Sequence, residues 1–184
     1  MNHLDEISDL LHVLPDFLSH EICDEIIEYS ESNPSIFYNR NKTNVNYGIN
    51  GDVGEYYAAE VSDTCSRRLW RKHFKHLEFD GVSLSEVQIN RYNKGAFIPP
   101  HNDRNGLFTF HTICIPLQTN DDNCLIFGDP DVYHNNINIE EAHKAGRIEI
   151  FRDKKGYGYH FEGTKPIHWV PAVTTNRYSL VLIF

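Results

Sequence analysis

The chain has 184 residues, 40% of them hydrophobic and 23% charged. This length and composition allow a sizeable buried core and predict one compact domain over residues 1–184. Its formal net charge of −9 argues against a protein that mainly grips nucleic-acid backbone, because neutralising phosphates requires a basic face. The acidic N-terminal segment lacks the features of a secretion signal, and no stretch reaches the roughly 18 apolar residues of a membrane span, so we expect a cytoplasmic protein without membrane contacts.

The first predicted element is a helix that follows Pro15. Ser19 or His20 is expected at its N-cap, because a side-chain oxygen there can satisfy a free backbone N–H. Apolar residues recur at helical spacing on one face, namely Ile22, Cys23, Ile26 and Ile27. We expect this helix to pack on a sheet.

Residues 34–57 are rich in Asn and Gly, with tyrosines interleaved among residues that favour turns. Such a segment is typical either of a mobile lid or of a hairpin with a surface loop, and both interpretations stay open. A second helix is expected from about Glu55 to Lys75, with Trp70 and Phe74 on its apolar stripe, facing the core. Residues 1–80 would thus form a helical N-terminal support.

From residue 81 on, short runs rich in β-branched and aromatic residues alternate with turn signals. Strands are expected at eight places: 85–92, 96–103, 108–117, 123–128, 146–153, 157–161, 168–173 and 178–184. A double-stranded β-helix, the jelly-roll or cupin architecture, accommodates this number and brings residues of distant strands to one open mouth. We therefore predict a mainly β chain of the α+β class, with a jelly-roll core in 81–184 and the N-terminal helices packed on one sheet.

Two imidazoles and one carboxylate stand on this strand-like sequence: His101 and Asp103 in PPHND, and His168 in PIHWVPAV. Side chains at positions i and i+2 of a strand project to the same side, so His101 and Asp103 can bind the same metal ion. Two histidines and one carboxylate leave three coordination positions open, as non-haem Fe(II) oxygenases require, whereas structural zinc sites are closed. We expect these three residues to bind a metal and to be catalytic, although histidines are often merely structural and this chain has 11.

Arg177 lies nine residues beyond His168, inside a run that predicts a buried strand. A buried arginine needs an anionic partner, and its planar fork can hold a carboxylate through two hydrogen bonds. Arg177 therefore suits the distal carboxylate of a dicarboxylic co-substrate. Ser179, two residues further on, points to the same face and is expected to assist.

The ordered set HxD, His and RxS, preceded by INRYNKGAF, resembles the 2-oxoglutarate and Fe(II)-dependent dioxygenases over residues 85–184. The closing HWVPAVTTNRYSLVLIF and the opening VLPDFLSHEICDEIIEYSE are most similar to prolyl-hydroxylase-like members. The resemblance implies Fe(II) held by His101, Asp103 and His168, with 2-oxoglutarate and O2 as co-substrates. It also implies Tyr92 as a second co-substrate contact.

The implied activity is hydroxylation of a peptidyl or free amino acid, proline being one candidate, with release of succinate and CO2. The chain lacks the Gly-Gly pair usual in prolyl hydroxylases after the strand at 108–117, so proline itself stays open. Residues 152–165 are longer than the matching stretch of typical relatives and are expected to shape the substrate entrance.

Three alternatives remain at this level. His160 competes with His168 as third ligand, because its separation from Arg177 is similar to that in AlkB-type repair demethylases. INRYNKGA also resembles the AlkB-type segment, so oxidative demethylation of nucleobases is the second function considered, although the acidic charge disfavours it. The third reading is a cupin-like binding module without catalysis.

Overall fold

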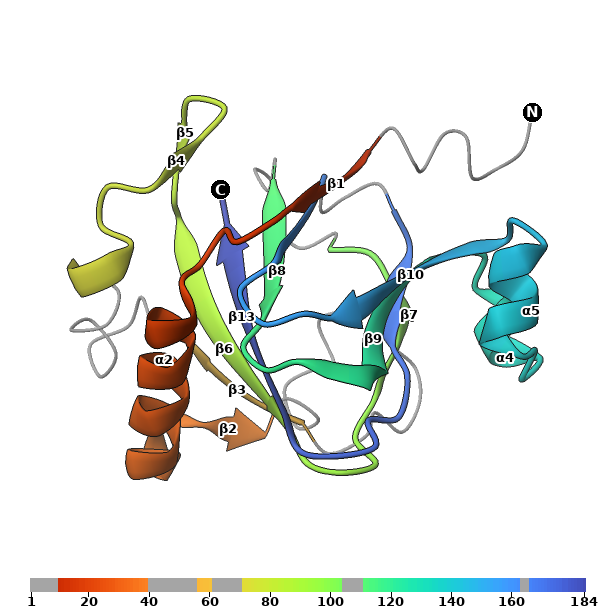
Figure 1. The fold of residues 1–184 in the computed structure, drawn as a ribbon, viewed down its shortest axis with the longest axis horizontal. Helices are drawn as coiled ribbons and strands as arrows, with labels where there is room; N and C mark the ends of the chain where they lie inside the picture. Colours follow the sequence, from red (N-terminus) through yellow and green to blue (C-terminus); the bar gives the residue numbers. More distant parts are fainter. Residues whose placement is uncertain (1–9, 40–55, 61–70, 104–110, 163–165) are drawn as a thin grey trace.

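Two antiparallel sheets, stacked face to face, form the centre of the protein (Figure 1). The computed structural model describes residues 10–39, 56–60, 71–103, 111–162 and 166–184. The major sheet contains, in spatial order, β1 (Leu11–Leu14), β11 (Gly158–Phe161), β8 (Thr112–Pro116), β13 (Arg177–Ile183), β6 (Glu86–Tyr92), β3 (Tyr56–Glu60) and β2 (Tyr38–Asn39). The minor sheet contains β10 (Ile148–Asp153), β9 (Asn120–Gly128), β12 (His168–Val170) and β7 (Ile98–His101). This is the predicted double-stranded β-helix.

All eight predicted strand runs contain a strand of these sheets, with shifts at their ends. Short elements outside the two sheets complete the described chain: helix α2 (His20–Ser32), the 3-10 helix η1 (Pro34–Ile36), the hairpin β4 (Glu78–Phe79) and β5 (Val82–Ser83), and the helices α4 (Asp131–His134) and α5 (Ile139–Lys144). None of the helices in the described ranges is long and apolar enough to cross a membrane.

Side chains that alternate along the strands divide the core into three parts. Residues on the outer face of the major sheet, such as Ile113, Leu180 and Leu182, pack with Cys23 and Ile26 of α2. Residues between the sheets form a second cluster that contains Tyr92, Leu125, Phe127, Phe161 and Val170. The outer face of the minor sheet packs with α4 and α5 through Trp169, Ile126, Ile148, Val132 and Ala142. The interior between the sheets is therefore enclosed by packed layers on both sides.

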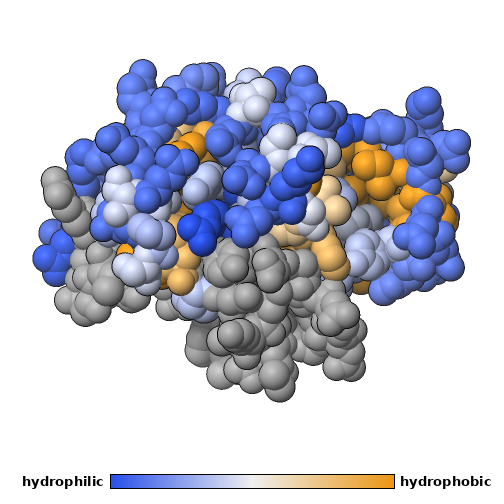
Figure 2. Space-filling model, turned by 90° about the horizontal axis from the view of Figure 1, so that it is seen from below, coloured by the Kyte–Doolittle hydropathy of each residue, from blue (hydrophilic) through white to orange (hydrophobic). Residues whose placement is uncertain are grey.

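Helix α2 begins as predicted. The Ser19 hydroxyl accepts a hydrogen bond from the backbone N–H of Ile22 at 3.4 Å, and the buried face contains Cys23 and Ile26. The helix lies against the major sheet, at the opposite end of the molecule from α4 and α5 (Figure 1). Figure 2 shows a largely hydrophilic underside, with hydrophobic surface near the end where α4 and α5 lie.

The helix predicted from Glu55 to Lys75 is wrong at its start. Residues 56–60 form strand β3, which pairs with β6 and β2, and residues 71–73 are helical, while 61–70 lie outside the described ranges. The strand forms because the backbone N–H and C=O groups along the edge of β6 can form hydrogen bonds with β3. This pairing joins residues far apart in the sequence, so the local helical spacing does not reveal it. Phe74 is buried in the core as predicted.

The structure describes parts of residues 34–57, the possible lid or hairpin, and of residues 152–165, which are expected to shape the substrate entrance. Of residues 34–57, the part 40–55 lies outside the described residues, and 34–39 contribute η1 and β2. Residues 152–161 belong to the sandwich, because β11 pairs with both β1 and β8. That pairing makes 158–161 part of the major sheet, and a role of 152–165 in shaping the substrate entrance stays a prediction.

Candidate metal centre

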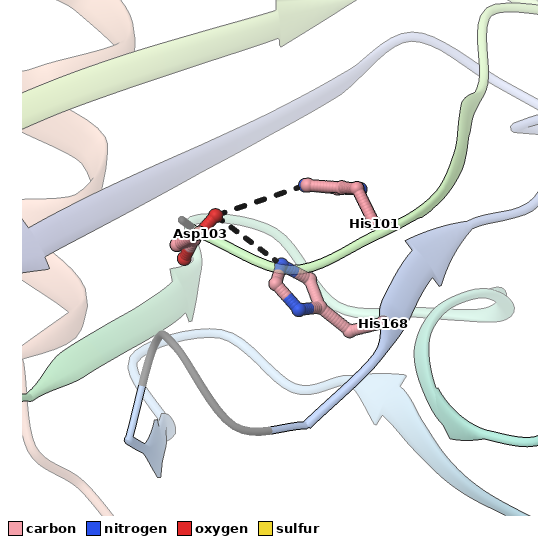
Figure 3. A group of neighbouring side chains, drawn as sticks. All are labelled: His101, Asp103 and His168. Carbon is pink, nitrogen blue, oxygen red and sulfur yellow. Dashed lines mark ion pairs between the residues drawn. The ribbon is translucent and has the colours of Figure 1, made fainter. Parts of the chain in front are cut away.

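The fold brings His101, Asp103 and His168 together. His101 ends β7 and His168 begins β12, and the two residues are paired in register. Oδ1 of Asp103 lies 3.8 Å from Nε2 of His101 and 3.8 Å from Nε2 of His168 (Figure 3). Within the described ranges this is the one group of three or more His, Cys, Asp or Glu side chains whose ligand atoms lie within 4.8 Å of one another.

Both histidines turn Nε2 toward the Asp103 carboxylate and Nδ1 toward a backbone carbonyl. Nδ1 of His101 lies 2.8 Å from the carbonyl oxygen of Pro99, and Nδ1 of His168 lies 3.3 Å from that of Pro166. Because a carbonyl oxygen only accepts, each Nδ1 is the donor, and in the neutral imidazole the lone pair that can bind a metal is then on Nε2. Burial lowers the pKa of His101 to about 4, with the neighbouring His168 adding to the effect and Asp103 opposing it. A neutral imidazole can bind a metal without first losing a proton.

The geometry fits a metal with open positions. Neighbouring ligand atoms around a metal at about 2.1 Å are roughly 3 Å apart, so small side-chain rotations would close the observed 3.8 Å separations. The rings of Phe127 and Phe161 lie 5.5 and 4.9 Å from the His168 ring and hold it in place. Asp103 is 30% exposed, so the centre opens to the outside on that side. Two imidazoles and one carboxylate with an open side can bind Fe(II) together with exchangeable ligands.

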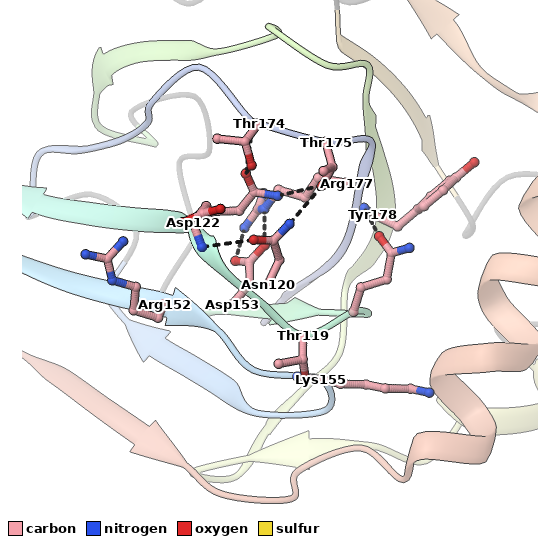
Figure 4. A network of polar contacts seen from close by, with 12 residues as sticks. Thr119, Asn120, Asp122, Arg152, Asp153, Lys155, Thr174, Thr175, Arg177 and Tyr178 are labelled. Carbon is pink, nitrogen blue, oxygen red and sulfur yellow. Dashed lines mark hydrogen bonds and ion pairs between the residues drawn. The ribbon is translucent and has the colours of Figure 1, made fainter.

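Arg177 has an anionic partner within the chain, Asp153. Nε of Arg177 donates to Oδ2 of Asp153 at 2.6 Å, and Nη2 donates to Oδ1 at 2.9 Å (Figure 4). The two residues are 4% and 1% exposed, and the pair joins β13 of the major sheet to β10 of the minor sheet. Burial alone would lower the pKa of Arg177, but the Asp153 carboxylate and its hydrogen bonds outweigh burial and raise it. The guanidinium is therefore charged and held from one edge.

The other residues predicted to bind the co-substrate lie beside Arg177. Tyr92 is paired with Arg177 in the β6–β13 register, and the Arg177 guanidinium carbon lies 5.0 Å from the centre of its ring. Ser179 follows on the same face of β13 and is buried. Arg177, Tyr92 and Ser179 thus share one wall of the interior between the sheets.

Cys114 on β8, the strand next to β13, packs against the buried cluster between the sheets. Burial raises its pKa to about 12, and the charges of Asp103, Arg177 and Asp153 all act on it. Tyr92 of this wall belongs to the same buried cluster as Phe127 and Phe161, which contact the His168 ring. The two groups of residues face one interior.

The competing histidine, His160, lies elsewhere. Phe161 faces the interior and packs on His168, so its neighbour His160 projects from the other face of β11. There Nε2 of His160 lies 3.0 Å from Nδ1 of His111, and the His160 ring stacks on His12. His160 is not brought together with His101 and Asp103.

Sequence reasoning missed Asp153 and Cys114. The need of Arg177 for an anion was visible in the sequence, but Asp153 is 24 positions away and stands in no motif. Cys114 has no neighbouring cysteine or histidine signature, and only the topology places its side chain between the sheets.

Comparisons with known proteins bear on the fold. No protein-family model matches the chain, and no curated protein matches its sequence. Among solved structures, a prolyl-4-hydroxylase of Pseudomonas putida is similar, with a TM-score of 0.63, 14% identity and coverage of 99% of this chain and 96% of that one. A prolyl hydroxylase of Trichoplax adhaerens, solved with a hypoxia-inducible-factor peptide fragment, has a TM-score of 0.64 and 12% identity, covering 98% of this chain and 86% of that one.

A third similar structure is a non-haem alpha-ketoglutarate-dependent epimerase from nogalamycin biosynthesis, with a TM-score of 0.65, 11% identity and coverage of 98% of this chain and 82% of that one. At such low identity these likenesses concern the fold alone. The chain has the double-stranded β-helix fold of these oxygenases, as the resemblance in its sequence implied.

Proposed function

We propose that this chain is an Fe(II)- and 2-oxoglutarate-dependent dioxygenase that hydroxylates a peptidyl or free amino acid. The observation that carries the proposal is the open ligand set of His101, Asp103 and His168 inside a double-stranded β-helix. A set of two imidazoles and one carboxylate suits Fe(II) chemistry with exchangeable ligands better than a closed structural site.

Each group of residues has a role in this proposal. His101, Asp103 and His168 would hold Fe(II) through Nε2, a carboxylate oxygen and Nε2. When bound, Fe(II) with 2-oxoglutarate and O2 supplies the oxidising chemistry that hydroxylates a C–H bond and releases succinate and CO2. Arg177, with Tyr92 and Ser179 beside it, would orient the far end of the co-substrate.

The apolar interior would protect the reaction from water. Phe127 and Phe161 pack against His168, and Leu125 belongs to the same buried cluster. The partly exposed side of Asp103 is where a substrate would approach.

An amino acid or peptide is the substrate class that we favour, and proline is one candidate. The similarity of the closing sequence to prolyl hydroxylases supports it, and the Trichoplax neighbour was solved with a peptide fragment. The formal charge of −9 makes the nucleobase alternative less favourable, because that reaction needs a grip on phosphates.

Product analysis tests the proposal. The Fe(II)-loaded protein is incubated with 2-oxoglutarate, O2 and either a mixture of free amino acids or a proline-rich peptide library. We expect succinate formation that rises with the correct substrate, and one added oxygen atom in that substrate by mass spectrometry. Asp103→Ala should abolish both signals. Succinate formation that is equal in Asp103→Ala and wild type would contradict the proposal.

A further inference from the structure

The anchor expected to bind the far end of the co-substrate is already paired inside the protein. Asp153 accepts hydrogen bonds from both Nε and Nη2 of Arg177 and so occupies one of the two edges of the guanidinium that can hold a carboxylate through two parallel hydrogen bonds. A ligand carboxylate would have to use the remaining Nη1 side or displace Asp153. Both routes bring a second anion close to a buried carboxylate.

Asp153 has little freedom to leave. It is 1% exposed, it ends β10, and its backbone is paired with Asn120 of β9 after an irregularity in the register. Such irregularities redirect side chains near functional sites, and here Asp153 points into the interior. A displaced Asp153 would remain a buried charge without its partner, which is unfavourable.

The cations next to Asp153 in the sequence do not supply a second positive charge. Each of them interacts with another group: Arg152 with Glu140, Lys155 with Asp24, and Lys154 with the ring of Tyr157. These three cations are therefore directed away from the buried pair of Arg177 and Asp153, which is neutral as one guanidinium and one carboxylate.

The charge balance of the whole interior follows from this pairing. A divalent metal with Asp103 carries one net positive charge, which the carboxylate next to the keto group of a 2-oxo acid would neutralise. A distal carboxylate would then add a negative charge beside a neutral pair, where its attraction to Arg177 is offset by repulsion from Asp153. A 2-oxo acid with an uncharged far end leaves the interior neutral.

We infer that Asp153 determines the co-substrate selectivity of this site: by neutralising Arg177, it removes the advantage of a distal carboxylate, so that the wild-type site takes a 2-oxo acid with an uncharged far end about as well as 2-oxoglutarate. This inference rests on the proposed function, because it concerns the 2-oxo acid that the metal centre would chelate. Asp153 is a positioning residue, since it acts through Arg177.

Calorimetry can test the inference without turnover. The anaerobic protein is loaded with Mn(II) in place of Fe(II) and titrated with 2-oxoglutarate or with 5-methyl-2-oxohexanoate, which has the same skeleton with an isopropyl group in place of the distal carboxylate. We expect the two dissociation constants of the wild type to agree within about threefold. In Asp153→Asn we expect 2-oxoglutarate to bind at least about tenfold more tightly, with the neutral acid changed by less than about threefold.

Asp122→Asn is the matched control. Asp122 is an exposed carboxylate of β9, so its removal changes the net charge equally without touching Arg177, and the wild-type ratio should persist. General damage to the fold would weaken the binding of both acids together and would not change the ratio of their dissociation constants. The wild-type ratio also needs no variant, so it decides the question if Asp153→Asn does not fold.

The outcomes separate the two proposals. If Mn(II) binds but neither acid binds to the wild type, the proposed function fails, and this inference fails with it. If both acids bind but the wild type prefers 2-oxoglutarate by about tenfold or more, this inference alone is overturned. The same holds if Asp153→Asn folds and binds 2-oxoglutarate no more tightly than the wild type does.

Discussion

A buried guanidinium and a buried carboxylate stabilise the native state only as a pair. Removing one partner of Arg177 and Asp153 leaves the other charge desolvated between the two sheets. We expect Arg177→Met to lower the free energy of unfolding by roughly 3–5 kcal/mol. Because the double variant Arg177→Met/Asp153→Leu removes both charges, it should lose clearly less than the sum of the two single variants.

Urea unfolding of the four proteins provides this double-mutant cycle. Losses that simply add would show that the two side chains are not coupled and would contradict the buried pair. The cycle is independent of any ligand, so it tests the pairing separately from its proposed effect on co-substrate selectivity.

His160 makes a pH-dependent contribution to stability. Burial lowers its pKa from 6.5 to about 4, and His111 and His12 act in the same direction. The unfolded chain therefore binds a proton more readily than the native protein between these values, and the free energy of unfolding falls as the pH falls from about 6.5 to about 4. His160→Phe should make this fall shallower.

Urea unfolding at pH 7 and pH 5 measures that fall. His134→Asn is the control, since it removes an exposed histidine at the end of α4 and should keep the wild-type dependence. If His160→Phe loses as much stability as the wild type between the two pH values, the proposed burial of a neutral His160 is wrong.

The grouping of His101, Asp103 and His168 could be predicted at this scale, whereas the partner of Arg177 could not. His101, Asp103 and His168 stand in short motifs with a ligand spacing that chemistry restricts. Asp153 was one of 26 acidic residues, and only the packing of β10 against β13 selects it.

At the scale of the elements, the turn between β10 and β11 is fixed to the start of α2. The N–H of Leu18 donates to the carbonyl oxygen of Gly156 at 2.9 Å, and Gly156 has a φ of +79°. A Cβ at Gly156 would lie 2.2 Å from the carbonyl oxygen of Leu18. Gly81 has a similar φ of +75°, but a Cβ there meets nothing within 4 Å.

The two glycines therefore form a matched pair for mutation. Gly81→Ala should lower the free energy of unfolding by about 1–2 kcal/mol, because alanine is strained in a left-handed backbone conformation. Gly156→Ala should cost roughly 1–3 kcal/mol more, because the strand turn and the helix must separate. Thermal or urea unfolding checks the difference, and equal losses at both positions would contradict the close contact.

The strands after residue 81 could be predicted because each has its own apolar run and its own turn signals. Strand β3 could not, since the residues at 56–60 also fit helical spacing and form a strand through pairing with β6. The short helices α4 and α5 also escaped prediction, because four and six residues are too few for a clear helical period.

At the scale of the whole molecule, the jelly roll converts distant sequence segments into one interior. β7 and β12, 67 positions apart between His101 and His168, become neighbours in the minor sheet, and the major sheet places Arg177 opposite Asp153. The sequence predicted the architecture from strand number and motif order. The charge state of the interior became visible only in the folded chain.

The most direct test of the account is the complex of the protein with Fe(II) and 2-oxoglutarate in the absence of O2. A 2-oxo acid chelated to Fe(II) gives a weak visible charge-transfer band, and the wild type should show it at saturating 2-oxoglutarate. His168→Ala should lose the band, whereas His160→Ala, on the other face of β11, should keep it. Bound Fe(II) without a band in the wild type, or a band that only His160→Ala removes, would contradict the assigned centre.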